Sequence, residues 1–587
     1  MEVTRLFDLL AWRNINYPKH DAFAGKVNNK WEIYTTEDYY EYSNLISYGL
    51  LALGLQPGDK IATSSNNRPE WNFIDMGMLQ SGIVHVPVYP TSSAKDLKFI
   101  FEDAEIKYIF ISNEEQFKKI SEIIKEIPSV KGIYTFDEVR GAPHWKEVVD
   151  LGRKNINEER LNEIRNSVQP GDLATLLYTS GTTGNPKGVM LSHNNIVSNF
   201  LAVRDLPPVD HTCRALSFLP LNHTYERVLN YLYQYLGLSI YYAESLETIA
   251  DNLKEVKPHV FGTVPRLLEK VYDRIVAKGN ELTGIKRSLF FWSLNLGHRY
   301  ELYNNNGILY DWQLNIARKL IFKKWQEALG GNVRAIVSGG AALNPKLARI
   351  FWAADIKVIE GYGLTETAPV IAVNNLEPGG AKFGTVGPPI MGVEVKIAED
   401  GEILSRGPNT MMGYYKQPEL TAEMIDADGW CHTGDIGVIE DGKYLKITDR
   451  KKEIFKTSGG KYIAPQALEN RMKESLFIEQ CMVIGENRKF AAALVVPSFT
   501  YLKDWCSKKG IPYSTNEEMV QNSIIITRIK EEVEKMNEEL AKYEQIKKIR
   551  LLPREWTIER YELTPKLSLK RKEILRTNAN LVEEIYG

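Results

Sequence analysis

Short apolar runs alternate with longer stretches of helical spacing over the first 170 residues, and this alternation restricts the fold more than any other feature of the chain. Strands separated by helices of about ten residues are typical of βαβ units, in which the strands form a mostly parallel sheet. In chain order, the predicted elements are strand 60–63, helix 70–82, strand 83–88, helix 96–105 and strands 108–111, 172–177, 333–337 and 356–359. The sequence therefore predicts an α/β fold built from several βαβ units.

After about residue 380 the predicted elements change: short strands separated by glycines replace the alternating strands and helices. Strands at 392–397, 401–404 and 442–447 indicate an antiparallel β subdomain. A polar cluster without periodicity at 448–453 is a predicted linker. The residues beyond it are numerous enough for a smaller α+β domain, and 521–543 is predicted to be a charged amphipathic helix.

Charge and cysteine content exclude several classes of protein. The chain has 73 Lys and Arg residues against 75 Asp and Glu, a formal charge of −2, whereas a general nucleic-acid coat needs a cationic excess. Its 4 cysteines include no C-x-x-C pair, which argues against a disulfide framework and against a zinc site. No run approaches the roughly 18 apolar residues of a membrane-spanning helix, and residues 1–14 do not resemble a signal peptide. We therefore expect a reducing, cytoplasmic compartment.

The segment LYTSGTTGNPKG at 177–188 combines hydroxyl groups, glycines and a lysine directly after a predicted strand. Glycine lets the backbone approach an anion closely, hydroxyl and N–H groups donate to it, and lysine adds positive charge. The spacing differs from that of a Walker A loop, in which lysine directly follows glycine. A mobile Gly/Thr surface turn is the alternative to a phosphate cradle. The candidate phosphate-binding residues are Thr179, Ser180, Gly181, Thr182, Thr183, Gly184 and Lys187.

This loop resembles the signature of the AMP-forming adenylate synthetases, the superfamily of acyl-CoA synthetases, peptide-synthetase adenylation domains and firefly luciferase. Four further segments resemble motifs of that superfamily and occur in its order across nearly the whole chain. They are SGGAAL at 338–343 on the adenine side, the adenylate motif GYGLTET at 361–367, the ribose motif WCHTGD at 430–435, and DRKKEIFKTSGGK at 449–461 with the hinge. The resemblance implies a large multi-sheet N-terminal domain, 1–451, with two βαβ-type subdomains and a β subdomain, and a small mobile α+β lid, 452–587.

The chemistry of individual residues suits the roles that this resemblance implies. An adenine ring can stack on Tyr362, Thr365 can donate to the α-phosphate, and the Glu366 carboxylate offers the oxygen ligands that Mg²⁺ prefers. Asp435 can accept from both ribose hydroxyls, and Arg450 carries several donors toward the same sugar. A solvated loop or turn position is the alternative for each of the three charged residues. The remaining candidates around the nucleotide are Gly339, Gly340, Ala341, Glu360, Gly361 and Gly363.

A carboxylic substrate needs a pocket of its own. The segment LPLNHTYERV at 219–228 resembles the motif that borders the acyl site in long-chain fatty acyl-CoA synthetases, which implies that His223 lies near the reacting carboxylate; a structural histidine is the alternative. Residues 228–237 either line an acyl tunnel or belong to the core. Residues 262–272 resemble the same branch, as does the extra helical stretch 283–329, whose aromatic and basic residues suit either a membrane surface or packing on the protein body.

The C-terminal motif departs from the usual form of the superfamily. Pro-Lys-Thr, a short spacer and Gly-Lys are common there, whereas this chain has LTPKLSLKR at 563–571. We assign Lys570 as the catalytic lysine, with Lys566 as the alternative. The resemblance implies that the C-terminal domain turns about the hinge residue Lys452 and withdraws Lys570 from the nucleotide. The loop that replaces it, beside the pantetheine of CoA, contains Ser458, Gly459 and Gly460.

The motifs together predict an ATP-dependent long-chain fatty acid–CoA ligase. Fatty acid and ATP would give acyl-AMP and diphosphate, and acyl-AMP and CoA would give acyl-CoA and AMP, with Mg²⁺ and Lys570 stabilising charge in the first step. Two alternatives stay open: a fatty acyl-AMP ligase or acyl–carrier-protein synthetase, and a non-catalytic lipid-binding partner of a membrane transporter. The expected partners are the small-molecule substrates and no nucleic acid; peripheral contact with the inner face of a membrane is left open.

Overall fold

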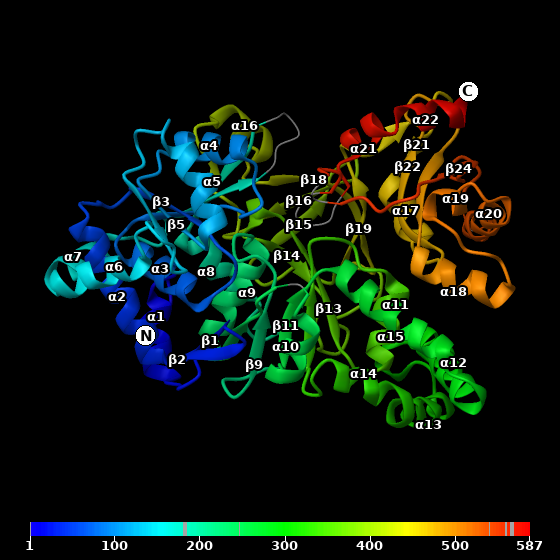
Figure 1. Cartoon of the computed structure of the whole chain (residues 1–587), viewed down its shortest axis with the longest axis horizontal. Helices are drawn as coiled ribbons and strands as arrows, with labels where there is room; N and C mark the ends of the chain where they lie inside the picture. Colours follow the sequence, from blue (N-terminus) through cyan, green and yellow to red (C-terminus); the bar gives the residue numbers. More distant parts are fainter. Residues whose placement is uncertain (1, 180–184, 246, 539, 558–559, 564–568) are drawn as a thin grey trace.

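A computed structural model describes residues 2–179, 185–245, 247–538, 540–557, 560–563 and 569–587 of the chain. Two large mixed sheets with their helices, a smaller antiparallel sheet and a C-terminal unit of helices and strands make up the molecule (Figure 1). The predicted α/β class is confirmed. Several sheets lie in the part of the chain up to Arg450, called the large part, and a smaller α+β unit, called the C-terminal unit, follows it.

The first large sheet has seven strands in the order β17-β8-β7-β4-β3-β5-β6. Pairing within β7-β4-β3-β5-β6 is parallel, as βαβ units require. Its strands are β3 (Lys60–Ser64), β4 (Val84–Pro87), β5 (Tyr108–Ile111), β6 (Gly132–Thr135), β7 (Leu173–Thr179), β8 (Lys187–Ser192) and β17 (Gly413–Tyr414). The helices of this region are α2 (Thr36–Ala52), α3 (Pro69–Gln80), α4 (Ala94–Asp103), α5 (Glu114–Ile124), α6 (Trp145–Lys154) and α7 (Glu158–Ser167). The elements predicted between residues 60 and 111 are confirmed.

The second large sheet has eight strands in the order β14-β13-β12-β11-β9-β10-β1-β2. The N-terminal hairpin β1–β2 joins it through parallel pairing of Phe23 with Ile240. Its strands are β1 (Phe23–Val27), β2 (Lys30–Tyr34), β9 (Arg214–Ser217), β10 (Ser239–Tyr242), β11 (Val260–Thr263), β12 (Ala335–Ser338), β13 (Val358–Gly363) and β14 (Val370–Val373). The associated helices are α1 (Asp8–Asn16), α8 (His193–Ala202), α9 (Thr224–Tyr235), α10 (Ile249–Val256), α11 (Pro265–Glu281), α12 (Gly284–His298), α13 (Ile308–Ala317), η2 (Arg318–Phe322), α14 (Lys323–Ala328) and α15 (Pro345–Ala353).

The predicted antiparallel β subdomain is confirmed as a four-stranded sheet in the order β15-β16-β18-β19. Its strands are β15 (Glu394–Ile397), β16 (Glu402–Arg406), β18 (Cys431–Glu440) and β19 (Tyr444–Arg450), with α16 (Pro418–Met424) beside them. The predicted linker at 448–453 is wrong in its first half. Asp449 and Arg450 pair with Ile436 and Asp435 and therefore extend β19, and the turn begins at Lys451.

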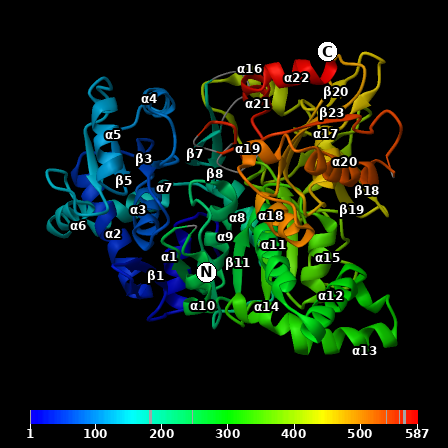
Figure 2. The ribbon, with the colours of Figure 1, turned by 45° about the vertical axis from the view of Figure 1, so that its right-hand side comes forward.

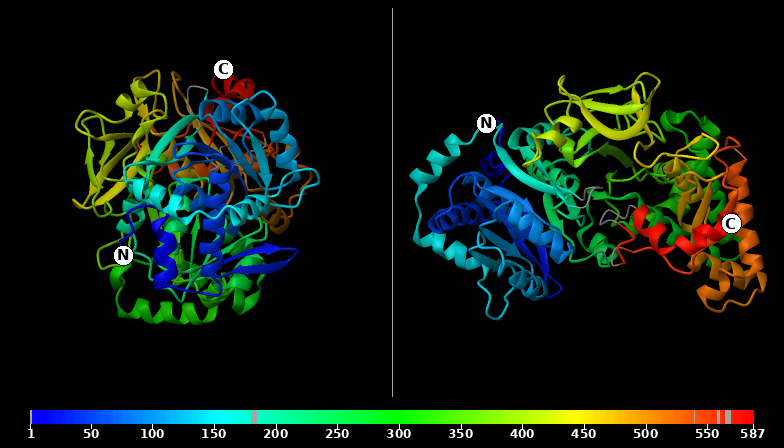
Figure 3. Two further views of the ribbon diagram at one scale, coloured as in Figure 1. Left: turned by 90° about the vertical axis from the view of Figure 1, so that its left-hand side faces the viewer. Right: turned by 90° about the horizontal axis from the view of Figure 1, so that it is seen from above.

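The C-terminal unit has hydrophobic clusters whose buried residues all come from Ile463 onward. Its strands are β20 (Phe455–Lys456), β21 (Tyr462–Ile463), β22 (Ile478–Ile484), β23 (Ala492–Pro497) and β24 (Lys548–Leu551). Its helices are α17 (Pro465–Met472), α18 (Phe499–Lys509), α19 (Asn516–Met519), α20 (Ser523–Asn537), α21 (Arg571–Thr577) and α22 (Ala579–Tyr586). The helix predicted at 521–543 corresponds to α20. The unit lies over α11 and α15 and far from α2 and α6 (Figures 2 and 3).

Helix α8 shows how local sequence fixes an element near the predicted phosphate loop. The Ser192 hydroxyl accepts from the Asn195 backbone N–H at 3.1 Å, and the side-chain Oδ1 of Asn195 accepts from the Ser192 backbone N–H at 2.9 Å, a reciprocal cap of the first helical turn. The Asn195 amide also donates to the Thr410 carbonyl at 2.8 Å. Because the next N–H, that of Met411, donates to the Glu366 carbonyl at 2.9 Å, this cap is connected to the adenylate motif.

Candidate active site

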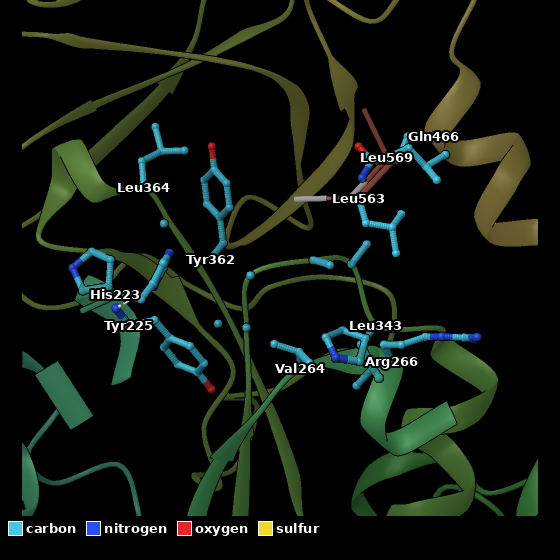
Figure 4. A pocket seen from close by; sticks show the side chains of 18 of the residues that line it. His223, Tyr225, Val264, Arg266, Leu343, Tyr362, Leu364, Gln466, Leu563 and Leu569 are labelled. Atoms are coloured by element: carbon cyan, nitrogen blue, oxygen red, sulfur yellow. Dashed lines mark hydrogen bonds between the residues drawn. The ribbon is translucent and has the colours of Figure 1, made fainter. Parts of the chain in front are cut away.

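A cavity of about 1950 Å³ lies between the two large sheets, the antiparallel sheet and the C-terminal unit. In Figure 4, His223, Tyr225 and Leu364 lie on one side of it, and Gln466, Leu563 and Leu569 of the C-terminal unit lie on the other. The cavity lining brings together these residues with predicted roles: Thr179, His223, Gly339, Gly340, Ala341, Glu360, Gly361, Tyr362, Gly363, Thr365, Glu366, Asp435, Arg450 and Lys570. Segments that are hundreds of residues apart in the sequence therefore share one site.

The aromatic, carboxylate and guanidinium residues predicted for the adenosine end are in direct contact. The Tyr362 hydroxyl donates to Oδ2 of Asp435 at 2.7 Å, and Nε of Arg450 lies 3.4 Å from Oδ1 of the same carboxylate. The adjacent strands β18 and β19 place Asp435 opposite Arg450. Burial raises the pKa of Asp435, and the Arg450 charge opposes this shift. The carboxylate thus keeps acceptor capacity at the cavity surface, as binding a sugar diol requires.

The glycine beside Tyr362 is required by close packing of the backbone against the following strand. A Cβ at Gly363 would lie 1.7 Å from the Pro369 carbonyl oxygen, so a side chain there is sterically excluded. Oε1 of Glu360 accepts from the Leu343 N–H at 2.9 Å and holds the SGGAAL segment. Burial raises the pKa of Glu360 to about 8, and the hydrogen bond from Leu343 opposes the shift. Burial of this carboxyl therefore favours its neutral form beside the cavity.

Strands β7 and β8 hold the two ends of the predicted phosphate cradle. Thr179 pairs with Lys187 across these antiparallel strands, and Nζ of Lys187 lies 5.4 Å from the ring centroid of Tyr414. Thr179 lines the cavity. The other candidates of this loop lie outside the described residues: Ser180, Gly181, Thr182, Thr183 and Gly184.

Glu366 offers a single carboxylate at the cavity, and its position suits a hard cation. Its Oε1 accepts from the Tyr414 hydroxyl at 2.8 Å, which leaves Oε2 and the second lone pair of Oε1 for a ligand. Among the described residues, no group of three His, Cys, Asp or Glu side chains could hold a metal ion by itself. Mg²⁺ commonly binds through one or two carboxylates together with substrate phosphates and water. The residues present therefore fit a Mg²⁺ ion that arrives with a nucleotide.

The wall of the cavity that was predicted to bind the acyl chain is formed by α9 and the residue that caps it. His223 is the N-cap of α9, and its Nδ1 accepts from the Tyr225 N–H at 3.1 Å. Of the run 228–237, three residues line the cavity and others are buried in the core, and an acyl tunnel along this run stays a prediction. The cavity-lining residues are Val228, Leu229 and Leu232. The core residues include Tyr231 and Tyr233.

A fully buried polar network fixes α9 to the sheet that carries the phosphate cradle. Nη2 of Arg227 lies 2.7 Å from Oδ1 of Asp75, and its Nη1 donates to the Thr175 hydroxyl of β7 at 2.8 Å. Nδ1 of His85 and the Tyr231 hydroxyl bind the same carboxylate at 2.6 Å each. Burial lowers the pKa of His85 to about 4, so Arg227 supplies the positive charge that balances Asp75. The network thus joins α9, on one wall of the cavity, to β7, whose last residue Thr179 lines the cavity.

The C-terminal unit presents Lys570 to the cavity. Lys570 is the N-cap of α21, its N–H donates to the Glu562 carbonyl at 2.8 Å, and its Nζ lies 5.4 Å from the ring centroid of Tyr561. The adjacent Arg571 is held by Glu453 at 3.1 Å and Glu469 at 2.6 Å. The alternative lysine, Lys566, lies outside the described residues.

The predicted hinge and the predicted CoA loop lie elsewhere. Lys451 is anchored to the antiparallel sheet by Glu402 at 2.9 Å and Asp400 at 2.6 Å, and the next residue, Lys452, is exposed. Ser458, Gly459 and Gly460, in the loop between β20 and β21, are exposed and are not part of the cavity lining.

The aromatic residues of 283–329 divide between packing and exposure. Phe290, Phe322 and Trp325 are buried in the core under α12 and α14, as the packing interpretation predicts. Trp312 of α13, by contrast, is 62% exposed. None of the described helices is both long and apolar enough to cross a bilayer.

Two tyrosines of the site were not identified from the sequence. Tyr414 binds Glu366 from β17, and the Tyr225 ring lies 3.3 Å from where a Cβ at Gly339 would stand. The Tyr225 hydroxyl donates to the Val337 carbonyl at 2.9 Å. Nothing in the spacing of these tyrosines distinguishes them from core aromatics, although Tyr225 follows His223 closely.

Two family models match the chain. The model described as AMP-binding enzyme matches residues 10–415, and the model described as AMP-binding enzyme C-terminal domain matches residues 452–587. A long-chain-fatty-acid–CoA ligase of Mycobacterium bovis, FadD15, is 31% identical over 580 residues, which cover 97% of this chain and 95% of that protein. Human long-chain-fatty-acid–CoA ligase 1 is 34% identical over 599 residues, which cover 96% of this chain and 83% of that protein.

Solved structures with the same fold share little sequence with the chain. The adenylation domain of a carboxylate reductase from Mycobacterium chelonae superposes with a TM-score of 0.76 at 21% identity, covering 99% of this chain and 91% of that one. An anthranilate CoA ligase, AuaEII, in complex with anthranoyl-AMP gives a TM-score of 0.72 at 18% identity and covers both chains completely. At these identities the likeness establishes the fold.

Proposed function

The chain belongs to the AMP-binding enzyme family, and on that premise we propose that it is an ATP-dependent long-chain fatty acid–CoA ligase. One observation carries this proposal furthest: a single cavity joins the Tyr362–Asp435–Arg450 cluster to the apolar face of α9. A nucleotide held at the first end and a fatty acid held at the second meet beside Thr365. The names of the relatives support a long-chain acid as the substrate.

The reaction proceeds in two displacement steps. In the first, a carboxylate oxygen of the fatty acid attacks the α-phosphorus of ATP, the bond to the β-phosphate oxygen breaks, and diphosphate leaves. In the second, the CoA thiol loses its proton and attacks the acyl carbon, the acyl carbon–oxygen bond breaks, and AMP leaves with that oxygen. The first step concentrates negative charge, which fixed cationic and N–H donors stabilise. Glu366, together with phosphate oxygens of the substrate, would hold Mg²⁺, which would neutralise charge on the triphosphate.

The residues have separate roles in this proposal. Tyr362 stacks on the adenine, while Asp435 and Arg450 bind the ribose. Thr365 donates to the α-phosphate, and His223 orients the fatty carboxylate. The backbone and hydroxyl groups of the cradle hold the phosphates together with Lys187.

We assign the two half-reactions to two positions of the C-terminal unit. Residues 1–451 hold the substrates, and residues 452–587 turn about Lys452. The structure presents Lys570 to the cavity while Ser458–Gly460 stay outside it, which supports the arrangement for acyl-AMP formation. After the turn, Gly459 and Gly460 would leave space for the pantetheine of CoA.

The solvent-facing side of α13, η2 and α14 suits peripheral contact with an anionic membrane. Its exposed apolar residues are Ile308, Leu309, Trp312 and Leu320. Lys319, Lys323 and Lys324 are exposed along the same side. Apolar insertion beside lysines is how peripheral helices hold anionic bilayers. Stronger co-sedimentation with phosphatidylglycerol vesicles than with phosphatidylcholine vesicles, lost when the three lysines are changed to Glu, is expected; equal sedimentation of both proteins would reject this surface.

Diphosphate release tests the function directly. The wild-type chain is incubated with ATP, Mg²⁺ and fatty acids of increasing length, with and without CoA. Turnover that needs CoA and yields acyl-CoA supports the ligase. Turnover with a holo carrier protein but without CoA would instead favour the acyl–carrier-protein synthetase, and absence of diphosphate release with every acid would favour a non-catalytic lipid-binding protein.

A further inference from the structure

Arg266 lies in the segment 262–272, which resembles the long-chain branch but has no part in the reaction proposed above. It stands in the first turn of α11, and its side chain lines the cavity (Figure 4). Its guanidinium pairs with Glu479 of β22 in the C-terminal unit. Both side chains are largely buried, with 19% and 14% exposed. This contact therefore joins the two parts of the chain directly.

A carboxylate cluster surrounds the Arg266 guanidinium. Glu269, one turn along α11, lies 3.1 Å from it, and Asp273 stands another turn further. Burial raises the pKa of Asp273 to about 6, with Glu479 adding to the shift and Arg266 opposing it. Across the junction, the large part thus contributes one cation and two acidic groups, and the C-terminal unit contributes a third. Without Arg266, these three acidic groups would repel one another.

A second ion pair and one apolar contact lie along the same junction. Nζ of Lys346, at the start of α15, lies 2.6 Å from Glu474, which follows α17. Leu476 packs against the hydrophobic cluster under α11 to α15. The Lys346–Glu474 pair, with 61% and 22% of its side chains exposed, can separate at little cost because solvent already screens it. The largely buried Arg266–Glu479 pair costs considerably more when one partner is removed, since the other charge stays behind without compensation.

We infer that the pairs Arg266–Glu479 and Lys346–Glu474 hold the C-terminal unit where Lys570 reaches the nucleotide, so that Arg266 and Lys346 are positioning residues for acyl-AMP formation. The inference rests on the proposed function. The pairs act through the position of α21 and touch no reacting atom. They must break when the unit turns for thioester formation. Their strength therefore sets how the enzyme divides its time between the two half-reactions.

Charge reversal and charge exchange test this inference. Arg266→Glu places a fourth acidic group in the cluster and should lower diphosphate release at least tenfold. Thioester formation from prepared acyl-AMP and CoA should stay within about twofold of wild type. The double variant Arg266→Glu with Glu479→Arg restores one cation facing three acidic groups, so diphosphate release should recover to within about threefold. Arg274→Glu is the matched control, since Arg274 is exposed on the same helix.

Several outcomes would overturn the inference. Unchanged diphosphate release in Arg266→Glu would show that the Arg266–Glu479 pair does not position the C-terminal unit for acyl-AMP formation. A loss that the Glu479→Arg exchange does not repair would show that Arg266 acts directly on a substrate. If Arg266→Glu loses both half-reactions, the double variant decides: recovery of both supports the pairing, and continued loss rejects it. Failure of wild-type turnover with every acid would instead reject the proposed function and leave no role for the pairs.

Discussion

The phenol of Tyr362 donates a hydrogen bond of 2.7 Å to Oδ2 of Asp435, which joins the residue proposed to stack on adenine to the residue proposed to bind ribose. The two side chains come from different sheets, β13 and β18. Because the two side chains touch, one bound adenosine would contact Tyr362 with its adenine and Asp435 with its ribose. Arg450, the last residue of β19, contacts the same Asp435 carboxylate.

Asp435→Ala removes the acceptor and leaves the Tyr362 hydroxyl and Arg450 without their shared partner. A hydrogen bond to a charged group contributes about 1.5–3 kcal/mol, so KM for ATP should rise by about tenfold or more. KM for the fatty acid should change little. Steady-state kinetics with each substrate varied separately will measure both, with the exposed Asp428→Ala as control. A rise confined to KM for the fatty acid would move Asp435 to the acyl end.

Lys570→Ala should reduce acyl-AMP formation by about a hundredfold or more, because the variant loses the cation that the C-terminal unit brings to the developing charge. Conversion of prepared acyl-AMP and CoA to thioester should persist. The control Lys572→Ala removes an exposed lysine from the same helix. Equal loss of both half-reactions would contradict the role assigned to Lys570.

Lys452→Pro should have the reverse effect. Proline restricts the backbone at the residue where the C-terminal unit is proposed to turn. Diphosphate release in the absence of CoA should stay near the wild-type level, while acyl-CoA formation should fall at least tenfold. Overall turnover equal to that of wild type would reject Lys452 as the hinge.

Glu366→Gln keeps the shape of the side chain and its acceptor for Tyr414 but removes the charge that suits Mg²⁺. The Mg²⁺ concentration for half-maximal diphosphate release should rise several-fold. Glu419→Gln is a matched control, since Glu419 is exposed in α16. A superimposable Mg²⁺ titration would remove Glu366 from the metal site.

Arg227→Met should destabilise the large part of the chain by about 3–5 kcal/mol, since it leaves Asp75 as a buried charge without its balancing cation. Denaturant unfolding followed by circular dichroism will measure the loss. Arg204 pairs with Asp205 at the surface, at 39% and 86% side-chain exposure, so Arg204→Met should change stability by about 1 kcal/mol or less. Similar losses in the two variants would contradict the account of the network.

Local patterns predicted the elements in which neighbouring residues decide the structure. Strand β5 is buried along its whole length and therefore reads as a continuous apolar run. Strand β2 is mostly exposed and gives no such signal, and β1 finds its partner Ile240 far along the chain. The prediction ended strand β19 too early because its last residues, Asp449 and Arg450, are polar and interrupt the apolar alternation of a strand.

The site residues were likewise predictable only where the signal is local in the sequence. Short motifs predicted Tyr362, Glu366 and Asp435, because each motif carries its chemistry within a few residues. The contacts that complete the site join distant segments. Tyr414 meets Glu366 across 48 positions, and Glu479 meets Arg266 across 213. Only the packing of separate sheets creates such pairs, so no local pattern contains them.

The fate of one oxygen atom tests the central claim, that the fatty carboxylate attacks the α-phosphorus of ATP. Palmitate labelled with oxygen-18 in its carboxyl group is converted by the wild-type chain with ATP, Mg²⁺ and CoA, and the products are analysed by mass spectrometry. The account predicts one labelled oxygen in each AMP and none in diphosphate. Label in inorganic phosphate together with ADP, or AMP without label, would contradict it.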